Sequence, residues 1–155
     1  MAKYDDASWH YGGNYPIGLS NKNASTHIGM FLTWCINNDL ISEEQMEDSK
    51  EDIENVKTRK STGAEFLINN CDEKFTDLDL NKIGNQFAKD YYSLSEKSSF
   101  SNKYADYLDD YAKILNNGSA EIDLYKVEDT WENYDLLKPT LDIRYKQWKE
   151  FIVKP

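Results

Sequence analysis

Apolar residues along the chain recur mainly at the three- and four-residue spacing of helices. The clearest case is the segment 24–38, whose apolar positions form one continuous stripe of Ile28, Phe31, Leu32, Cys35 and Ile36. Asn23 or Ser25 can cap the start of this segment, and Asn37 begins a polar run that ends it. We therefore predict a core helix here, with the Phe31 side chain buried.

Two capping boxes mark the next helix starts. The letters S-E-E-Q from Ser42 predict a helix that runs to about Thr58. The letters T-G-A-E from Thr62 predict a short helix that ends near Asn70. The inner side of the first of these helices carries few apolar residues, namely Met46, Ile53 and Val56. Because so little of that helix is apolar, we expect it to lie on the surface.

Three weaker patterns follow along the chain. Thr76 can cap a helix whose inward positions are Leu80, Ile83, Phe87 and Tyr91. Residues 104–115 carry tyrosine and leucine at helical spacing, which predicts another helix. Residues 122–127 instead alternate between apolar and polar positions, which allows at most one short strand.

The C-terminal part is predicted to hold two helices separated at a proline. Asp129 with Glu132 can cap the first, and Pro139 must break or kink it because proline lacks the backbone N–H. The last helix carries an apolar stripe of Leu141, Tyr145, Trp148 and Ile152. Together the patterns predict one mainly α, compact domain over residues 1–155, with six or seven helices and at most a short strand or hairpin.

The N-terminal stretch has an unusual load of aromatic residues, as the letters K-Y-D-D-A-S-W-H-Y-G-G-N-Y-P show. Such rings have too much apolar area to lie free in water, since each buries ~150–250 Å² when docked. We therefore predict an ordered loop in which Trp9 pins the segment onto the helix at 24–38, and Gly12-Gly13 turns the chain. Asp5, Asp6 and His10 would then lie near the rim beside His27. The structural interpretation of His27, one turn before Phe31, is that it packs at the edge of the core with its nitrogens hydrogen-bonded.

The charge of the chain narrows the class of partner. Its 28 acids against 18 bases give a formal charge of −10, so a nucleic acid would be repelled and a basic protein attracted. No apolar run approaches the ~20 residues of a membrane span, and no secretory leader is visible. We expect a cytoplasmic protein without membrane contact, in which Cys35 and Cys71 stay reduced.

The two histidines are the candidates for catalysis, because only histidine titrates unperturbed near neutral pH. With Asp5 and Asp6, His10 and His27 could form a general-base site or hold a metal through imidazole and carboxylate groups. Their spacing matches no H-x-x-x-H or H-E-x-x-H motif, and the chain carries no G-x-S-x-G elbow, Walker loop or dinucleotide fingerprint. We therefore assign no catalytic residue, metal ligand or cofactor from the sequence.

The segment 43–54 is strongly acidic, with seven carboxylates and the single base Lys50. Its carboxylates lack the Asp and Gly spacing of a calcium loop. Two interpretations remain: a face that is simply solvated, or a surface that steers a basic protein partner.

Several blocks of the chain resemble a family of small uncharacterised bacterial proteins. The N-terminal blocks are K-Y-D-D-A-S-W-H-Y-G-G-N-Y-P and N-A-S-T-H-I-G-M-F-L-T-W. The later blocks are G-N-Q-F-A-K-D-Y-Y and V-E-D-T-W-E-N-Y-D-L-L-K-P-T-L-D-I-R-Y-K-Q-W, so the resemblance spans nearly the whole chain. It implies a bacterial cytosolic protein of one domain, and no reaction. Proteins of this kind are similar in size and charge to immunity proteins, which neutralise secreted toxins of rival bacteria.

The sequence favours a protein-binding module over an enzyme, with an immunity protein that blocks a basic toxin domain as the leading hypothesis. The alternatives are a small enzyme that uses the histidines and aspartates, and an adaptor or structural subunit. The candidate partner-binding residues are Asp5, Asp6, Trp9, His10, Tyr11, His27, Glu47, Asp48, Glu51 and Asp52.

Overall fold

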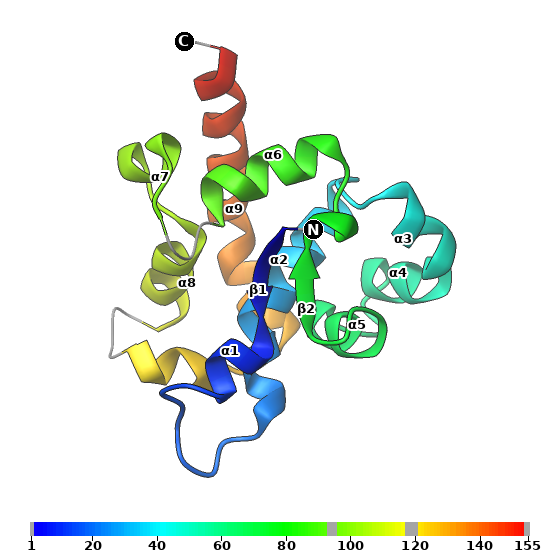
Figure 1. The fold of residues 1–155 in the computed structure, drawn as a ribbon, viewed down its shortest axis with the longest axis vertical. Helices are drawn as coiled ribbons and strands as arrows, with labels where there is room; N and C mark the ends of the chain where they lie inside the picture. The colour runs from blue at the N-terminus through cyan, green and yellow to red at the C-terminus, as the bar shows by residue number, and fades with distance from the viewer. Residues whose placement is uncertain (1, 93–95, 117–120, 154–155) are drawn as a thin grey trace.

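The computed structural model describes residues 2–92, 96–116 and 121–153, and it is mainly helical, as the sequence predicts (Figure 1). The first half consists of β1 (Lys3–Asp6), α1 (Ala7–Tyr11), η1 (Asn21–Ser25), α2 (Thr26–Asn37), α3 (Glu43–Asp48), α4 (Lys50–Lys57), α5 (Gly63–Asn70) and β2 (Lys74–Thr76). The second half consists of η2 (Asp77–Asp79), α6 (Lys82–Tyr91), α7 (Ser99–Lys103), α8 (Tyr107–Leu115), η3 (Glu121–Lys126) and α9 (Trp131–Val153). The η elements are short 3-10 helices.

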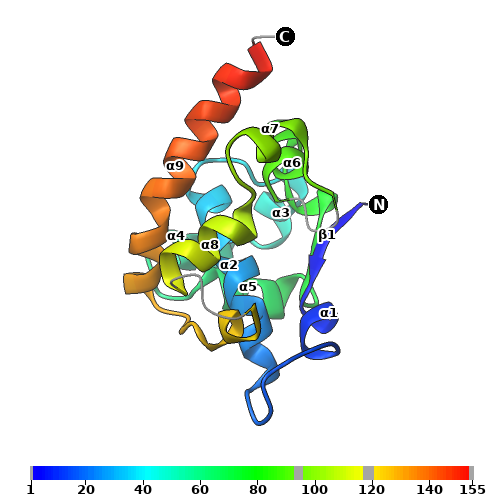
Figure 2. The same cartoon turned by 90° about the vertical axis from the view of Figure 1, so that its left-hand side faces the viewer.

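The predicted core helix is α2, and it lies at the centre of the molecule (Figures 1 and 2). Eleven of its twelve residues are buried, so it is covered on all sides and not along one stripe only. Helix α5 approaches it closely because Gly29 of α2 has no side chain: a Cβ there would lie 2.5 Å from the Cα of Ala64. The burial of Phe31 is confirmed, with no exposed surface.

An aromatic cluster surrounds Phe31. Its ring lies 5.0–6.3 Å, between centroids, from the rings of Trp34, Phe75, Phe87, Tyr91, Tyr92 and Tyr107. Five of these rings come from α2, β2, α6 and α8, and Tyr92 directly follows α6, so one side chain joins four elements that are distant in sequence.

The N-terminal strand pairs with a strand more than sixty residues away in sequence. β1 and β2 form a two-stranded antiparallel sheet, with Asp5 opposite Phe75 and a bulge between Lys3 and Asp5. This pair orders the N-terminus, as predicted, but by backbone hydrogen bonds. The segment 122–127, where the sequence allowed a strand, lies mostly in the 3-10 helix η3.

The predicted surface helix at 42–58 is in fact two helices, α3 and α4, which meet at the buried Ser49. Ser42 accepts the backbone N–H of Gln45, but the Gln45 side chain turns away to Asp79, so this capping box is only half formed. Met46 is 43% exposed, which makes its inward assignment wrong. The other inward positions, Ile53 and Val56, are buried. The capping box at Thr62 is complete.

Two predicted features around α6 need correction. Thr76 caps the short η2, and it is Asn81 that caps α6, by accepting the backbone N–H of Gly84. Ile83 is 50% exposed, although the helical spacing placed it inward. Gly84 packs against Leu40, which explains a glycine inside this helix.

The long helix α9 runs through Pro139 without a break, so the predicted division into two helices is wrong. Pro139 and Asp135, whose carbonyl loses its helical partner, are both exposed, and water can therefore replace the missing bond. The helix is fixed to the core by two indole donors: Trp34 bonds to Asp142, and Trp148 bonds to Asp90. At its start Thr130, and not Asp129, accepts the first free N–H, that of Asn133.

Every helix among residues 2–92, 96–116 and 121–153 is too short or too polar to cross a bilayer.

Candidate functional site

Three N-terminal elements bring Asp5, His10 and His27 together. Asp5 lies on β1, where pairing with β2 fixes the strand, and the next residue, Asp6, caps α1 by accepting the backbone N–H of Ser8. His10 lies one turn into α1. His27 is the second residue of α2 and is buried in the core. Strand, cap and helix start therefore aim three polar side chains at one point.

The Asp5 carboxylate is fully buried and accepts four hydrogen bonds. Its Oδ1 lies 2.6 Å from His10 Nε2 and 2.8 Å from the backbone nitrogen of Asp6. Its Oδ2 lies 2.6 Å from the Tyr92 hydroxyl and 3.2 Å from His27 Nε2. Because an ionised carboxylate only accepts, both imidazoles must carry a hydrogen on Nε2.

Tyrosine hydroxyls surround the two imidazoles. The Tyr125 hydroxyl lies 2.6 Å from His10 Nδ1, and the Tyr107 hydroxyl donates to the His27 backbone carbonyl at 2.5 Å. The two imidazole rings meet edge to face, with centroids 4.6 Å apart. The Tyr111 ring also contacts His27, but its buried hydroxyl has no hydrogen-bond partner within the described parts of the chain.

The charges of the cluster follow from burial and hydrogen bonding. Burial alone would raise the pKa of Asp5, but the hydrogen bonds from His10 and His27 outweigh it and hold that pKa well below its usual range. Burial lowers the pKa of His27 even though the neighbouring Asp5 acts in the opposite direction. At neutral pH the cluster therefore contains an aspartate anion and a neutral His27.

The structure brings together three of the N-terminal residues that the sequence singled out. Asp5, His10 and His27 come together, but Asp5 is buried beneath the surface and not at the rim. Asp6 faces Ser8 and Lys3 and does not join them. Tyr11 is partly buried against the core.

The predicted role of Trp9 is wrong. Its side chain is 51% exposed, with the Lys3 ammonium 5.3 Å from the ring centroid. The N-terminus is therefore held by the sheet, by buried Ala7 and by the Asp5 network, and Trp9 is left on the surface.

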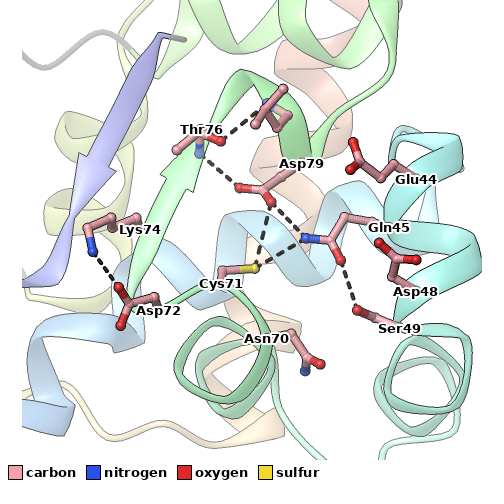
Figure 3. Close-up of a pocket in the computed structure, with 11 residues that line it drawn as sticks. Glu44, Gln45, Asp48, Ser49, Asn70, Cys71, Asp72, Lys74, Thr76 and Asp79 are labelled. Atoms are coloured by element: carbon pink, nitrogen blue, oxygen red, sulfur yellow. Dashed lines mark hydrogen bonds and ion pairs between the residues drawn. The ribbon is translucent and has the colours of Figure 1, made fainter.

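A second candidate site is an open cleft of about 400 Å³ between α3 on one side and α5, β2 and η2 on the other (Figure 3). Glu44 and Asp48 lie on the α3 side, and Asp72 and Asp79 lie on the other. The one base on its lining, Lys74, is paired with Asp72 at 2.5 Å. The cleft therefore presents excess negative charge.

The buried end of this cleft is held by hydrogen bonds. Asp79 accepts from Gln45 and from the backbone N–H of Thr76, and it lies 3.7 Å from the Cys71 sulfur. Burial first, and then the charge of Asp79, raise the pKa of Cys71, so this thiol stays protonated.

Among the acidic residues singled out from the sequence, Asp48 lines the cleft, whereas Glu47, Glu51 and Asp52 lie outside its lining. Sequence reasoning missed the opposite wall, from Asn70 to Asp79. The signals there were Cys71 and four acidic residues between positions 72 and 79, which have no distinctive spacing.

A family model described as a domain of unknown function, DUF7832, matches residues 3–127. The chain belongs to this family. The DUF7832 match covers every residue of the Asp5 network and of the acidic cleft, and it ends before α9 begins. No curated protein and no solved structure matches the chain at a significant level.

Proposed function

We propose that this protein is a bacterial immunity protein, which acts in the cytoplasm and neutralises a toxin by binding a basic surface of it. The observation that carries the proposal is the acidic cleft, which is concave, open and lined by carboxylates from two sides. Its one lining base is already paired within the cleft. An arginine or lysine side chain of a partner is the group of complementary charge and size.

The surroundings of the cleft support a protein partner. Leu78 on its lining is 55% exposed, which provides apolar contact beside the charges. Glu43, Glu47, Glu51 and Glu54 on the adjoining helices α3 and α4 are exposed and extend the negative field. With a net charge of −10, this field would accelerate encounter with a basic partner, an effect that salt weakens.

The enzyme alternative is supported less well. Convergence of Asp5, His10 and His27 is what a general-base site needs. However, both Nε2 atoms and His10 Nδ1 already have partners inside the protein, and Asp5 is fully buried. The adaptor alternative has no structural observation of its own.

The test begins with the reading frame adjacent to the gene. If its product is toxic when expressed alone, co-expression of this protein should restore growth, and the two purified proteins should form a stable complex. No toxicity from the neighbouring product, or toxicity that this protein leaves unchanged, would contradict the proposal.

Matched charge variants then test the cleft. Glu44→Lys with Asp48→Lys changes the charge by the same amount as Glu51→Lys with Glu54→Lys, but only the first pair lines the cleft. Both pairs should slow association at low salt, and only the cleft pair should also accelerate dissociation, because it loses contacts in the complex. Equal dissociation rates for the two pairs would show that the partner binds elsewhere.

A further inference from the structure

We propose that Asp5, His10 and His27 form a binding site for one divalent transition-metal ion, with Zn²⁺ as the best match. This inference does not depend on the proposed toxin partner. It rests on the convergence of one carboxylate and two imidazoles from β1, α1 and α2 on a single buried point.

The separations of the ligand atoms are close to those of a zinc site. One ligand atom from each residue lies within 4.8 Å of the other two. Bonds of about 2.0–2.2 Å in a tetrahedron place neighbouring ligand atoms about 3.4 Å apart. The distances from Asp5 oxygens to the Nε2 atoms are 2.6 Å for His10 and 3.2 Å for His27. An ion could therefore enter with side-chain shifts of about 1 Å, without a change of fold.

The ligand types select the ion. Two imidazoles and one carboxylate suit Zn²⁺ and related first-row ions, whereas Mg²⁺ and Ca²⁺ prefer oxygen ligands alone.

The proposed ligands have further hydrogen-bond partners, as the ligands of metal sites usually do. The Tyr125 hydroxyl is hydrogen-bonded to His10 Nδ1. Asp5 also accepts hydrogen bonds from the Tyr92 hydroxyl and from the Asp6 backbone N–H. Such second contacts orient ligands and fix the histidine tautomer.

Metal binding requires the imidazole hydrogens that face Asp5 to leave Nε2, and this needs no co-reactant. Before binding, the hydrogen on Nε2 of each imidazole faces an Asp5 oxygen. On binding, that hydrogen moves through solvent exchange to Nδ1 of the same ring, and Nε2 takes the metal. The hydrogen on His10 Nδ1 then donates to the Tyr125 hydroxyl oxygen.

The competing explanation is that the four hydrogen bonds on Asp5 form a metal-free clamp. Measuring Zn²⁺ and Co²⁺ binding to the full chain distinguishes the metal site from the metal-free arrangement. After chelator treatment, calorimetric titration with Zn²⁺ should give one equivalent with a dissociation constant of about 1 μM or lower. Co²⁺ should give an absorption spectrum of nitrogen and oxygen ligands, without a thiolate charge-transfer band.

Variants locate the ion. His10→Gln and His27→Gln should each weaken Zn²⁺ binding at least 10-fold. Tyr125→Phe should weaken it about 10- to 100-fold, because its hydroxyl orients the His10 ring. Cys71→Ser in the acidic cleft is the matched control and should leave binding unchanged. If His27→Gln fails to fold, the wild-type cobalt spectrum and His10→Gln, at the more exposed ring, still decide the question.

Three results would overturn the proposal. The first is no binding of Zn²⁺ or Co²⁺ to the wild-type chain at 100 μM, which would establish the metal-free clamp. The second is binding that both histidine variants retain. The third is a thiolate band that disappears in Cys71→Ser, which would place the ion in the acidic cleft.

Discussion

Replacing Phe31 by alanine should be among the most damaging single changes in the core. The side chain has no exposed surface, and its ring contacts six other aromatic rings from four elements. Phe→Ala in a core costs ~3–5 kcal/mol, and the cost rises where the neighbours cannot collapse into the space. Large rings that already hold one another in place fill such a cavity poorly, so we expect the upper half of that range. For a chain of 155 residues this lowers the melting temperature by ~8–20 °C.

Urea denaturation followed by far-UV circular dichroism and by tryptophan fluorescence would measure this loss, since Trp34 lies next to Phe31. The midpoint should fall with little change in slope. Ile83→Ala is the matched control, because Ile83 is apolar, helical and half exposed, and it should cost less than ~1 kcal/mol. A Phe31→Ala loss below ~1 kcal/mol, or equal losses in the two variants, would refute the packing argument.

Gly29→Ala should destabilise the protein by about 3 kcal/mol in the same assay, because the new Cβ would lie 2.5 Å from the Ala64 Cα and α5 would have to move. A loss below ~1 kcal/mol would mean that the contact between α2 and α5 is looser than described. Cys71 should react with iodoacetamide at pH 8 more slowly than an unperturbed thiol, because burial and Asp79 raise its pKa, and Asp79→Asn should accelerate the reaction by removing the negative charge. Equal rates in the two proteins would exclude a role for that charge. Trp9→Ala should change the melting temperature by less than ~2 °C, since half of the ring is exposed, and a fall above ~5 °C in calorimetry would restore Trp9 as a structural anchor.

The helices could be predicted because their signals are local. The stripe at 24–38 and the capping box at Thr62 each depend on residues within one or two turns, and both correspond to helices of the structure. The same local rule placed Met46 and Ile83 inward, where each is about half exposed. Spacing shows which residues share a face, but the faces of short surface helices are decided by what packs against them.

The sheet could not be predicted, because its partners are far apart in sequence. β1 has four residues and β2 has three, too few for alternation to be visible. The continuity of α9 through Pro139 is a different case. Proline removes one hydrogen bond, and here the two residues concerned, Asp135 and Pro139, are exposed while two indoles anchor the helix.

The candidate sites also depend on contacts between residues that are far apart in the sequence. The sequence named His10, His27 and Asp5 together on the basis of residue type alone, and the structure supplies the geometry through the β1–β2 pairing. Tyr92 and Tyr125 completed the network without any signal, since eleven tyrosines are spread along the chain. Only one wall of the acidic cleft could be predicted from the sequence. Helix α3 is rich in acidic residues, whereas the wall from Asn70 to Asp79 carries no recognisable motif.

The N-terminal stretch is ordered by its polar residues more than by its largest aromatic one. Trp9 lies on the surface, whereas Asp5, one of the most polar residues of the stretch, is fully buried. A buried carboxylate is tolerated only when its hydrogen bonds are satisfied, and removing a partner from such a group costs several kcal/mol. The side-chain donors to Asp5 come from α1, from α2 and from Tyr92, which directly follows α6, so the N-terminal strand cannot leave its place without leaving these donors unpaired. Four directional bonds thus specify the position of the strand more narrowly than a tryptophan packed on a helix could, and they bring both histidines to one point.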